Sequence, residues 1–192
     1  DLIRRNIDSV TAFLLLIWSL PVTVLLALLL KLTAGNTFRA VSVVGLRPLA
    51  IGPLANVETF ELLRFNTRRE DGSVTQIGRL LERFELNRLP ELWNVFRGDM
   101  CLVGVKPITP DEAAHVTEAW QEQRYSYPAG FTGLWYVQST PQRSRDDSLI
   151  ADTYYTATRS WREDVRLVWQ SVGVWLRRLL TMGVNYESRN TF

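Results

Sequence analysis

A long apolar stretch lies near the start of the chain. Residues 9–30 read SVTAFLLLIWSLPVTVLLALLL and contain no charged side chain. At about 1.5 Å per residue, a helix of this length just crosses a hydrocarbon core of about 30 Å. Pro21 predicts a kink midway, and the hydroxyl of Ser19 can satisfy a carbonyl that the kink frees. The stretch therefore predicts a bent membrane helix, because helices buried in soluble cores are rarely so long and so apolar on every face.

Basic residues flank this stretch on both sides. Arg4 and Arg5 precede it, and Lys31 and Arg39 follow it. Cytoplasmic segments next to membrane helices are enriched in Lys and Arg, so both ends of this helix are expected on the cytoplasmic face. A re-entrant hairpin is therefore favoured, and a full transmembrane crossing is the alternative.

Strands and a helix are predicted in the middle of the chain. Residues 35–60 carry glycines and prolines around a β-branched piece, AVSVVG, and residues 60–67 alternate enough for another short strand. Residues 78–96 follow a mostly helical pattern that is interrupted near 87–90. Gly98 is well placed to end this helix.

Helices are also expected in the second half. Thr109 as N-cap, Pro110 in the first turn and Glu112 in a capping box predict a helix that runs through TPDEAAHVTEAWQEQR. Residues 160–180 place apolar side chains at helical spacing, at Trp161, Val165, Val168, Val172, Trp175 and Leu179. This segment is either an amphipathic core helix or an interfacial helix whose Trp and Arg side chains meet lipid headgroups.

These patterns predict an α+β fold that is mainly helical. A kinked membrane helix, re-entrant or transmembrane, occupies residues 1–34, and a small cytoplasmic domain with few short strands and amphipathic C-terminal helices occupies residues 35–192. The 22 basic and 20 acidic residues give a net charge of only +2, which does not suggest a nucleic-acid-binding protein. The single cysteine, Cys101, excludes an internal disulfide.

Several short motifs together are specific enough to indicate a family. In chain order they are RFNT at 64–67, Gly78 with Arg79, LPELWNVFRGDMCLVG at 89–104, PAGFTGLW at 128–135, and Asp152, Tyr155 and Asp164. Their order and spacing resemble the bacterial sugar transferases, the monotopic polyprenol-phosphate phosphoglycosyl transferases. The likeness runs from about Arg4 to about Leu180, and the block at 89–104 is its most specific part.

The resemblance implies a location and a reaction. Members of this family lie on the cytoplasmic face of the bacterial inner membrane and move a sugar phosphate from a UDP-sugar to undecaprenyl phosphate in surface-glycan synthesis. Their nucleophile is an aspartate directly before the Leu-Pro of the central block, followed by a glutamate that helps to hold Mg²⁺. The partners that the resemblance implies are membrane lipid, polyprenol phosphate and a nucleotide sugar. An active transferase or a second copy of the chain is a further candidate partner if the chain serves as a scaffold.

The two catalytic positions of the family are changed in this chain. They are Asn87 and Arg88, and a neutral amide is a very poor nucleophile beside a carboxylate. Arg88 cannot ligate Mg²⁺, which prefers hard oxygen ligands, so the metal site is expected to be lost and no cofactor is predicted. Asn87 is instead expected to be the N-cap of the following helix, with Pro90 in its first turn.

Basic residues around these positions suggest a different use. Arg88 is expected to be either a solvated helix-start residue or a phosphate clamp, because guanidinium binds phosphate without metal. The resemblance places Arg64, Arg79 and Lys106 near it, as further candidate phosphate ligands.

Three hypotheses follow. The first is a pseudoenzyme, a catalytically inactive member retained for binding or as a scaffold. The second is an active transferase with a rearranged site that uses Glu85, Glu91 or Asp99, of which Glu91 is one helical turn from Asn87. The third is a membrane domain without a ligand. The first is favoured, because displacing a nucleophile by several ångströms spoils in-line attack.

Overall fold

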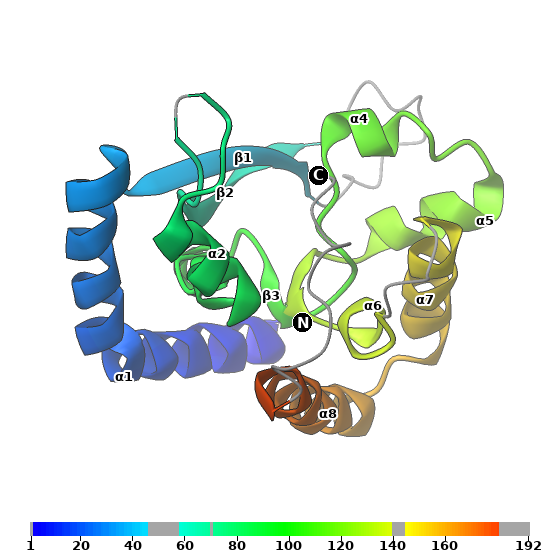
Figure 1. Cartoon of the computed structure of the whole chain (residues 1–192). Helices are drawn as coiled ribbons and strands as arrows, with labels where there is room; N and C mark the ends of the chain where they lie inside the picture. The colour runs from blue at the N-terminus through cyan, green and yellow to red at the C-terminus, as the bar shows by residue number, and fades with distance from the viewer. Residues whose placement is uncertain (1, 46–57, 70, 140–144, 181–192) are drawn as a thin grey trace.

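The first element, α1 (Leu2–Ala34), is a bent helix. The computed structural model describes residues 2–45, 58–69, 71–139 and 145–180. Figure 1 shows α1 as two arms that meet at a sharp bend. Pro21 lies inside the helix, and the Ser19 hydroxyl donates to the carbonyl of Leu16 at 3.3 Å. The predicted kinked helix is confirmed, and residues Ile3–Thr33 are long and apolar enough to cross a membrane by length and composition alone.

A two-stranded hairpin follows α1. Strands β1 (Phe38–Val44) and β2 (Thr59–Phe65) pair in antiparallel register, with Phe38 opposite Phe65. Both strands were predicted from their β-branched and alternating residues. The loop expected between them, at 46–57, lies outside the described residues.

Short helices and a second strand pair complete the domain. The remaining elements are α2 (Gln76–Arg83), the 3₁₀ turn η2 (Leu86–Arg88), α3 (Glu91–Arg97), β3 (Cys101–Val103), α4 (Pro110–Ala113), α5 (Ala119–Glu122), the 3₁₀ turn η3 (Gln123–Ser126), β4 (Gly130–Thr132), α6 (Leu134–Val137), α7 (Arg145–Thr158) and α8 (Trp161–Leu180). Strands β3 and β4 pair in parallel. The mainly helical α+β class with few short strands is confirmed.

One predicted helix is shorter than expected. The capping box of Thr109 and Glu112 is present, with Pro110 in the first turn. The helix ends at Ala113, however, and the chain continues as the separate α5 and η3, so the prediction of one helix through residue 124 is wrong. The carbonyls of Pro110 and Glu112 accept from the N–H of Ala114, and the backbone N–H of Thr117 and of Glu118 bonds to the Gln121 side chain instead of continuing the helix.

Both arms of α1 pack against the domain. In the first arm Ala12 is buried with Val43 and Val95, and Phe13 stacks on Phe96 with ring centroids 5.5 Å apart. In the second arm Leu30 is buried in a cluster with Phe65 and Leu81. The bent helix thus follows two sides of the domain, which lies inside the angle of the bend (Figure 1).

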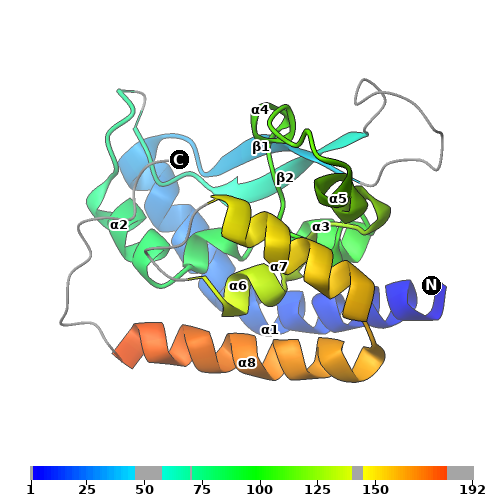
Figure 2. The same cartoon turned by 90° about the vertical axis from the view of Figure 1, so that its right-hand side faces the viewer.

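Helix α8 has one packed side and one exposed apolar side. Leu167 and Ser171 face inward, and the Ser171 hydroxyl lies 2.5 Å from the hydroxyl of Thr132 on β4. A row of apolar side chains at helical spacing is exposed: Trp161, Val165, Trp169, Val172, Leu176 and Leu180. Figures 1 and 2 both place α8 and the first arm of α1 along the same lower side of the molecule.

Candidate active site

The central block at 89–104 joins the hairpin to α3. Asn94 is fully buried; its side-chain oxygen accepts from the N–H of Leu63 at 3.0 Å, and its amide donates to the carbonyl of Glu61 at 2.7 Å and to Asp99 at 3.0 Å. Gly98 ends α3 in the left-handed region, at φ 84°, as predicted. The residues that make this block specific therefore fix the backbone beside the site.

The strand pair β3–β4 brings two glycines into close approach. A Cβ placed on Gly130 would lie 2.1 Å from the backbone nitrogen of Gly104. No side chain fits there, because real Cβ contacts of that length do not occur. The glycines explain how the 128–135 segment can lie directly against the end of the central block.

The turn that carries the two changed positions is tight and partly strained. Glu85 precedes it at φ 56°, the one non-glycine residue with positive φ among the described parts of the chain. The N–H of Arg88 bonds to the Glu85 carbonyl, and the N–H of Leu89 to the Leu86 carbonyl, both at 3.2 Å. These i→i+3 bonds form the 3₁₀ turn, so the backbone is already in a helical conformation shortly before α3 begins.

The predicted capping role of Asn87 is wrong. Helix α3 starts at Glu91, its N-cap position is Pro90, and it has no side-chain cap bond. Asn87 lies inside the preceding 3₁₀ turn instead, half-buried. An Asn87 cap would bind the N–H two or three residues further on, but the N–H of Leu89 already donates to the carbonyl of Leu86 and Pro90 has no N–H.

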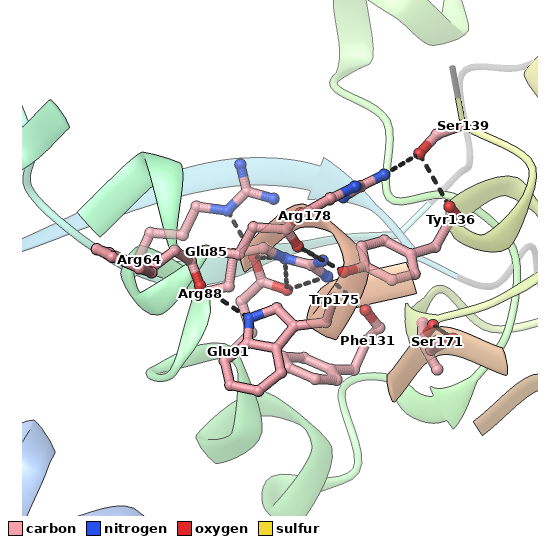
Figure 3. Close-up of polar contacts among 12 residues, drawn as sticks. Arg64, Glu85, Arg88, Glu91, Phe131, Tyr136, Ser139, Ser171, Trp175 and Arg178 are labelled. Carbon is pink, nitrogen blue, oxygen red and sulfur yellow. Dashed lines mark hydrogen bonds and ion pairs between the residues drawn. The ribbon is translucent and has the colours of Figure 1, made fainter. Parts of the chain in front are cut away.

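Arg88 is buried, so the expectation of a solvated side chain is wrong. Its side chain is 12% exposed and lies against Glu91, with an Nη2–Oε2 distance of 3.0 Å. The guanidinium also donates to the carbonyl of Phe131 and lies 3.7 Å from Glu85. Its central carbon is 4.9 to 5.6 Å from the ring centroids of Phe131, Trp135 and Tyr136. Figure 3 shows the guanidinium between the two glutamates.

Five charged side chains form a continuous series, here called the ion chain: Arg64, Glu91, Arg88, Glu85 and Arg178. Glu91 is fully buried, and Arg64 Nε lies 2.6 Å from its Oε1. Arg178 bonds to Glu85 at the other end. Three arginines and two glutamates give the ion chain a formal charge of +1, so its carboxylates are already neutralised from within (Figure 3).

The environment keeps Arg88 charged and Tyr136 protonated. Burial alone would lower the pKa of Arg88, but the carboxylates of Glu91 and Glu85 outweigh it and raise that pKa. Burial and the neighbouring Glu85 raise the pKa of Tyr136 well above its usual value. The Tyr136 hydroxyl therefore serves as a donor, and it donates to Glu85 at 2.8 Å.

The Mg²⁺ that the family resemblance implies does not fit these residues. The positions of the family dyad hold an amide and a guanidinium, and both nearby carboxylates are paired with arginines. Within residues 2–45, 58–69, 71–139 and 145–180, no three His, Cys, Asp or Glu side chains are grouped as a metal site would require. A divalent cation would have to displace an arginine to reach oxygen ligands here.

The predicted phosphate ligands are not all together. Arg64 and Arg88 share Glu91. Arg79 is exposed on α2, and Lys106 lies near α4, where its ammonium is 3.8 Å from Glu112. The contacts of the described residues therefore unite only the first two of the four.

The other two candidate carboxylates differ in place. Glu85 belongs to the ion chain, whereas Asp99 lies after α3, bonded to Asn94 and 3.2 Å from Arg97.

Residues from late in the sequence complete the site, and sequence patterns gave no signal for them. Arg178 and Trp175 come from α8, more than 80 positions after the turn that they contact. Tyr136 comes from α6. The amphipathic pattern of residues 160–180 does not single out Arg178, because its pairing with Glu85 depends on the tertiary fold.

The three late motif residues hold backbone and helix α1 in place. Asp152 accepts from the N–H of Lys106 at 3.0 Å, and burial raises its pKa to about 6 against the opposing effect of Arg124. The hydroxyl of Tyr155 donates to Asp164 at 2.6 Å, and Arg4 of α1 reaches both of them at 3.0 Å. These residues thus anchor the start of α1 to the domain.

Comparison with known proteins decides the family. A model described as "Bacterial sugar transferase" matches residues 1–178. The chain belongs to the bacterial sugar transferase family. The two positions that the resemblance assigns to the catalytic dyad hold Asn87 and Arg88 in this member of the family.

Named relatives give the setting of the family. The chain is 31% identical over 130 residues to the "UDP-galactose-lipid carrier transferase" of Erwinia amylovora, which covers 68% of this chain but 26% of that protein. It is 31% identical over 194 residues to the "UDP-glucose:undecaprenyl-phosphate glucose-1-phosphate transferase" of Caulobacter vibrioides, covering 90% of this chain and 69% of that protein. It is 27% identical to the "Exopolysaccharide production protein ExoY" of Sinorhizobium fredii, covering 88% and 83%. The chain thus spans about a quarter of the length of the first of these.

Proposed function

We propose that this chain is a catalytically inactive member of the bacterial sugar transferase family that serves as a binding or scaffold domain in surface-glycan synthesis. Its named relatives transfer sugar phosphates to a lipid carrier or take part in exopolysaccharide production. The candidate partners are a polyprenol phosphate, a nucleotide sugar, and an active transferase or a second copy of the chain.

The observation that carries the proposal is the ion chain. The family nucleophile attacks from the first dyad position, where this chain has an amide that cannot form the phospho-enzyme bond. At the second position, Arg88 is held by Glu91, Glu85 and the Phe131 carbonyl, so it is part of the fold. The site is therefore occupied by arginine and glutamate side chains that form ion pairs with one another.

The rival function is an active transferase with a rearranged nucleophile. Glu91 is the nearest candidate, one turn from Asn87, but it is fully buried and bound by two arginines. It would have to lose both partners before it could reach phosphorus, and removing one partner of a buried ion pair costs about 3–5 kcal/mol. That cost adds to the activation free energy of the reaction, and each increase of roughly 1.4 kcal/mol slows the reaction tenfold.

A transfer assay tests the proposal. Purified chain is incubated with undecaprenyl phosphate and a panel of radiolabelled UDP-sugars, with the Caulobacter vibrioides relative as the positive control. We expect no label in the lipid product. Robust transfer that is lost in Glu91→Gln would establish the rearranged active site instead.

We also propose that α1 is re-entrant and places the domain on the cytoplasmic face of the bacterial inner membrane. Arg4 bonds to Val103 and Tyr155 at one end of α1, and Leu30 is buried against the domain near the other end. A helix that crossed a bilayer would carry one of its ends away from the domain. The exposed apolar row of α8 fits an interfacial position beside it.

Cysteine labelling tests this topology. Single cysteines replace Asn6 and Thr33, both exposed and near opposite ends of α1. Burial raises the pKa of the native Cys101 thiol to about 12, so this residue gives little background labelling. We expect both new thiols to react from the cytoplasmic side only, and labelling from opposite faces would support a transmembrane crossing.

Any bound phosphate is proposed to be held without Mg²⁺. Arg64 is the most accessible arginine of the ion chain, because its side chain is 37% exposed. The Arg88 side chain is instead paired with Glu85 and Glu91. Titration of the chain with a UDP-sugar is expected to give the same affinity in Mg²⁺ and in EDTA, and weaker binding in Arg64→Ala. Binding that requires Mg²⁺ would contradict this.

A further inference from the structure

The conformation of Glu85 needs an explanation. A non-glycine residue at φ 56° is held in the left-handed region, which costs free energy unless the surrounding structure compensates. Glu85 has no N-cap bond to η2, although it occupies the N-cap position. Besides Arg88 within the turn, its side chain contacts residues from α6 and α8.

The last two turns of α8 supply these contacts. The Trp175 indole N–H donates to the carbonyl of Phe84 at 2.9 Å, directly before Glu85. Arg178 bonds to the Glu85 carboxylate, and its second amino group donates to the Ser139 hydroxyl at 2.5 Å. The Arg178 guanidinium also lies 4.8 Å from the ring centroid of Tyr136, which itself donates to Glu85. Figure 3 shows Arg178, Tyr136 and Ser139 gathered on one side of Glu85.

We infer that Trp175 and Arg178 are positioning residues that hold the 84–88 turn, and with it Asn87 and Arg88, in the observed conformation. Trp175 fixes the backbone before Glu85, and Arg178 fixes its side chain, so φ of Glu85 is restrained from both sides. The inference is independent of whether the chain is catalytic. On this inference the site is formed by both the central block and α8. A displacement of α8 would therefore change the conformation of the 84–88 turn directly.

Hydrogen exchange of the purified chain in detergent micelles tests the inference. Arg178→Ala removes the bond to Glu85, and we expect the amides of residues 84–89 to exchange about tenfold faster, or ~1.4 kcal/mol. The matched control is Arg177→Ala, the exposed neighbour on the same helix, with an expected change below about twofold. Trp175→Phe removes the N–H donor and keeps a smaller aromatic ring, and we expect the amides of the turn to exchange about threefold faster. Amides of the β1–β2 hairpin should remain unchanged in all three.

A double-mutant cycle separates positioning from general destabilisation. Glycine accepts φ 56° without strain, so in a Glu85→Gly background Arg178→Ala should add less than about twofold to exchange of the turn. Arg178→Lys, which keeps a cation near Glu85, should recover part of the protection. A tenfold effect that persists in the Glu85→Gly background would overturn the inference, as would equal effects of Arg177→Ala and Arg178→Ala.

If Arg178→Ala does not fold, the same hydrogen-exchange measurement is made on Trp175→Phe and Arg178→Lys. Local exchange at the turn in those two variants supports the inference, and exchange spread equally over the hairpin overturns it.

Discussion

Two regions of the molecule use buried charge in different ways. Around Asp152, which matches the family, a carboxylate and Arg124 lie 3.2 Å apart and hold the backbone of Lys106 by its N–H and its carbonyl. At the 85–91 turn, where the chain departs from the family, the charges of the ion chain mainly satisfy one another. Asp152 and Arg124 therefore hold backbone, whereas Arg88 lies mainly among charged and aromatic side chains.

This difference explains how the dyad could change while the fold persisted. A residue that bonds to backbone cannot be exchanged without leaving a buried N–H or carbonyl unpaired. Arg88 stands where the family resemblance implies a metal-binding carboxylate, and its guanidinium lies near two glutamates and three aromatic rings. The comparison can be sharpened by removing charge from each region in turn.

The largest effect is expected from removing Arg88. Arg88→Ala leaves Glu91 buried beside a cavity, and loss of one member of a buried pair costs about 3–5 kcal/mol of unfolding free energy. Denaturant unfolding measures it, and millimolar guanidinium ion should restore part of the stability by occupying the vacated position. Arg97→Ala is the control, since Arg97 is 57% exposed and such surface pairs contribute below about 1 kcal/mol. A loss no greater than that of the control would contradict the ion chain's structural role.

Removing the Asn94 side chain should lower the free energy of unfolding almost as much, because this side chain binds buried backbone groups. Asn94→Ala leaves the N–H of Leu63 and the carbonyl of Glu61 without partners, at about 1–3 kcal/mol for each buried group. We expect about 3 kcal/mol in denaturant unfolding. Asn66→Ala, which removes one local turn bond to the N–H of Arg68, should cost about 1 kcal/mol or less. Equal losses would argue against a special role for the central block.

Asp152 should make stability depend on pH between about 4 and 6. Its pKa is raised from 3.8 to about 6 in the fold, so the folded state binds a proton more tightly than the unfolded state. Its contribution to stability is thus fully present below pH 4 and is lost as pH rises through 6, by about 3 kcal/mol. Comparison of unfolding free energies with Asp152→Asn across this range isolates the effect. An identical pH slope in both proteins would refute it.

The smallest effect is expected from adding Mg²⁺ to a variant with the dyad restored, compared with the same variant without the ion. The double variant Asn87→Asp with Arg88→Glu replaces +1 by −2 at these positions, so Mg²⁺ should raise its Tm by about 2–4 °C, or ~1 kcal/mol. Asn87→Asp alone should show no such rise, because Arg88 pairs with the new carboxylate and repels the metal. A Mg²⁺-dependent rise in the unaltered chain would show that its site still holds the ion.

The sequence predicted the scaffold better than the site. The bent α1, both strands of the hairpin, the end of α3 at Gly98 and the extent of α8 followed from local patterns of apolar residues, proline and glycine. The resemblance placed Arg64 near Arg88, but the pairing of Arg178 with Glu85 could not be predicted, because it depends on tertiary contacts. The capping role given to Asn87 failed because a 3₁₀ turn had already paired the N–H of Leu89 and Pro90 has no N–H.

Trapping of a covalent intermediate tests the central claim most directly. The purified chain is mixed with UDP-sugar labelled in its β-phosphate, quenched, and separated by denaturing electrophoresis beside the Caulobacter vibrioides relative. With Asn87 in place of the nucleophile and Glu91 bound by two arginines, we expect no labelled protein band with the unaltered chain. A labelled band that disappears in Glu91→Gln would contradict the account and identify Glu91 as a working nucleophile.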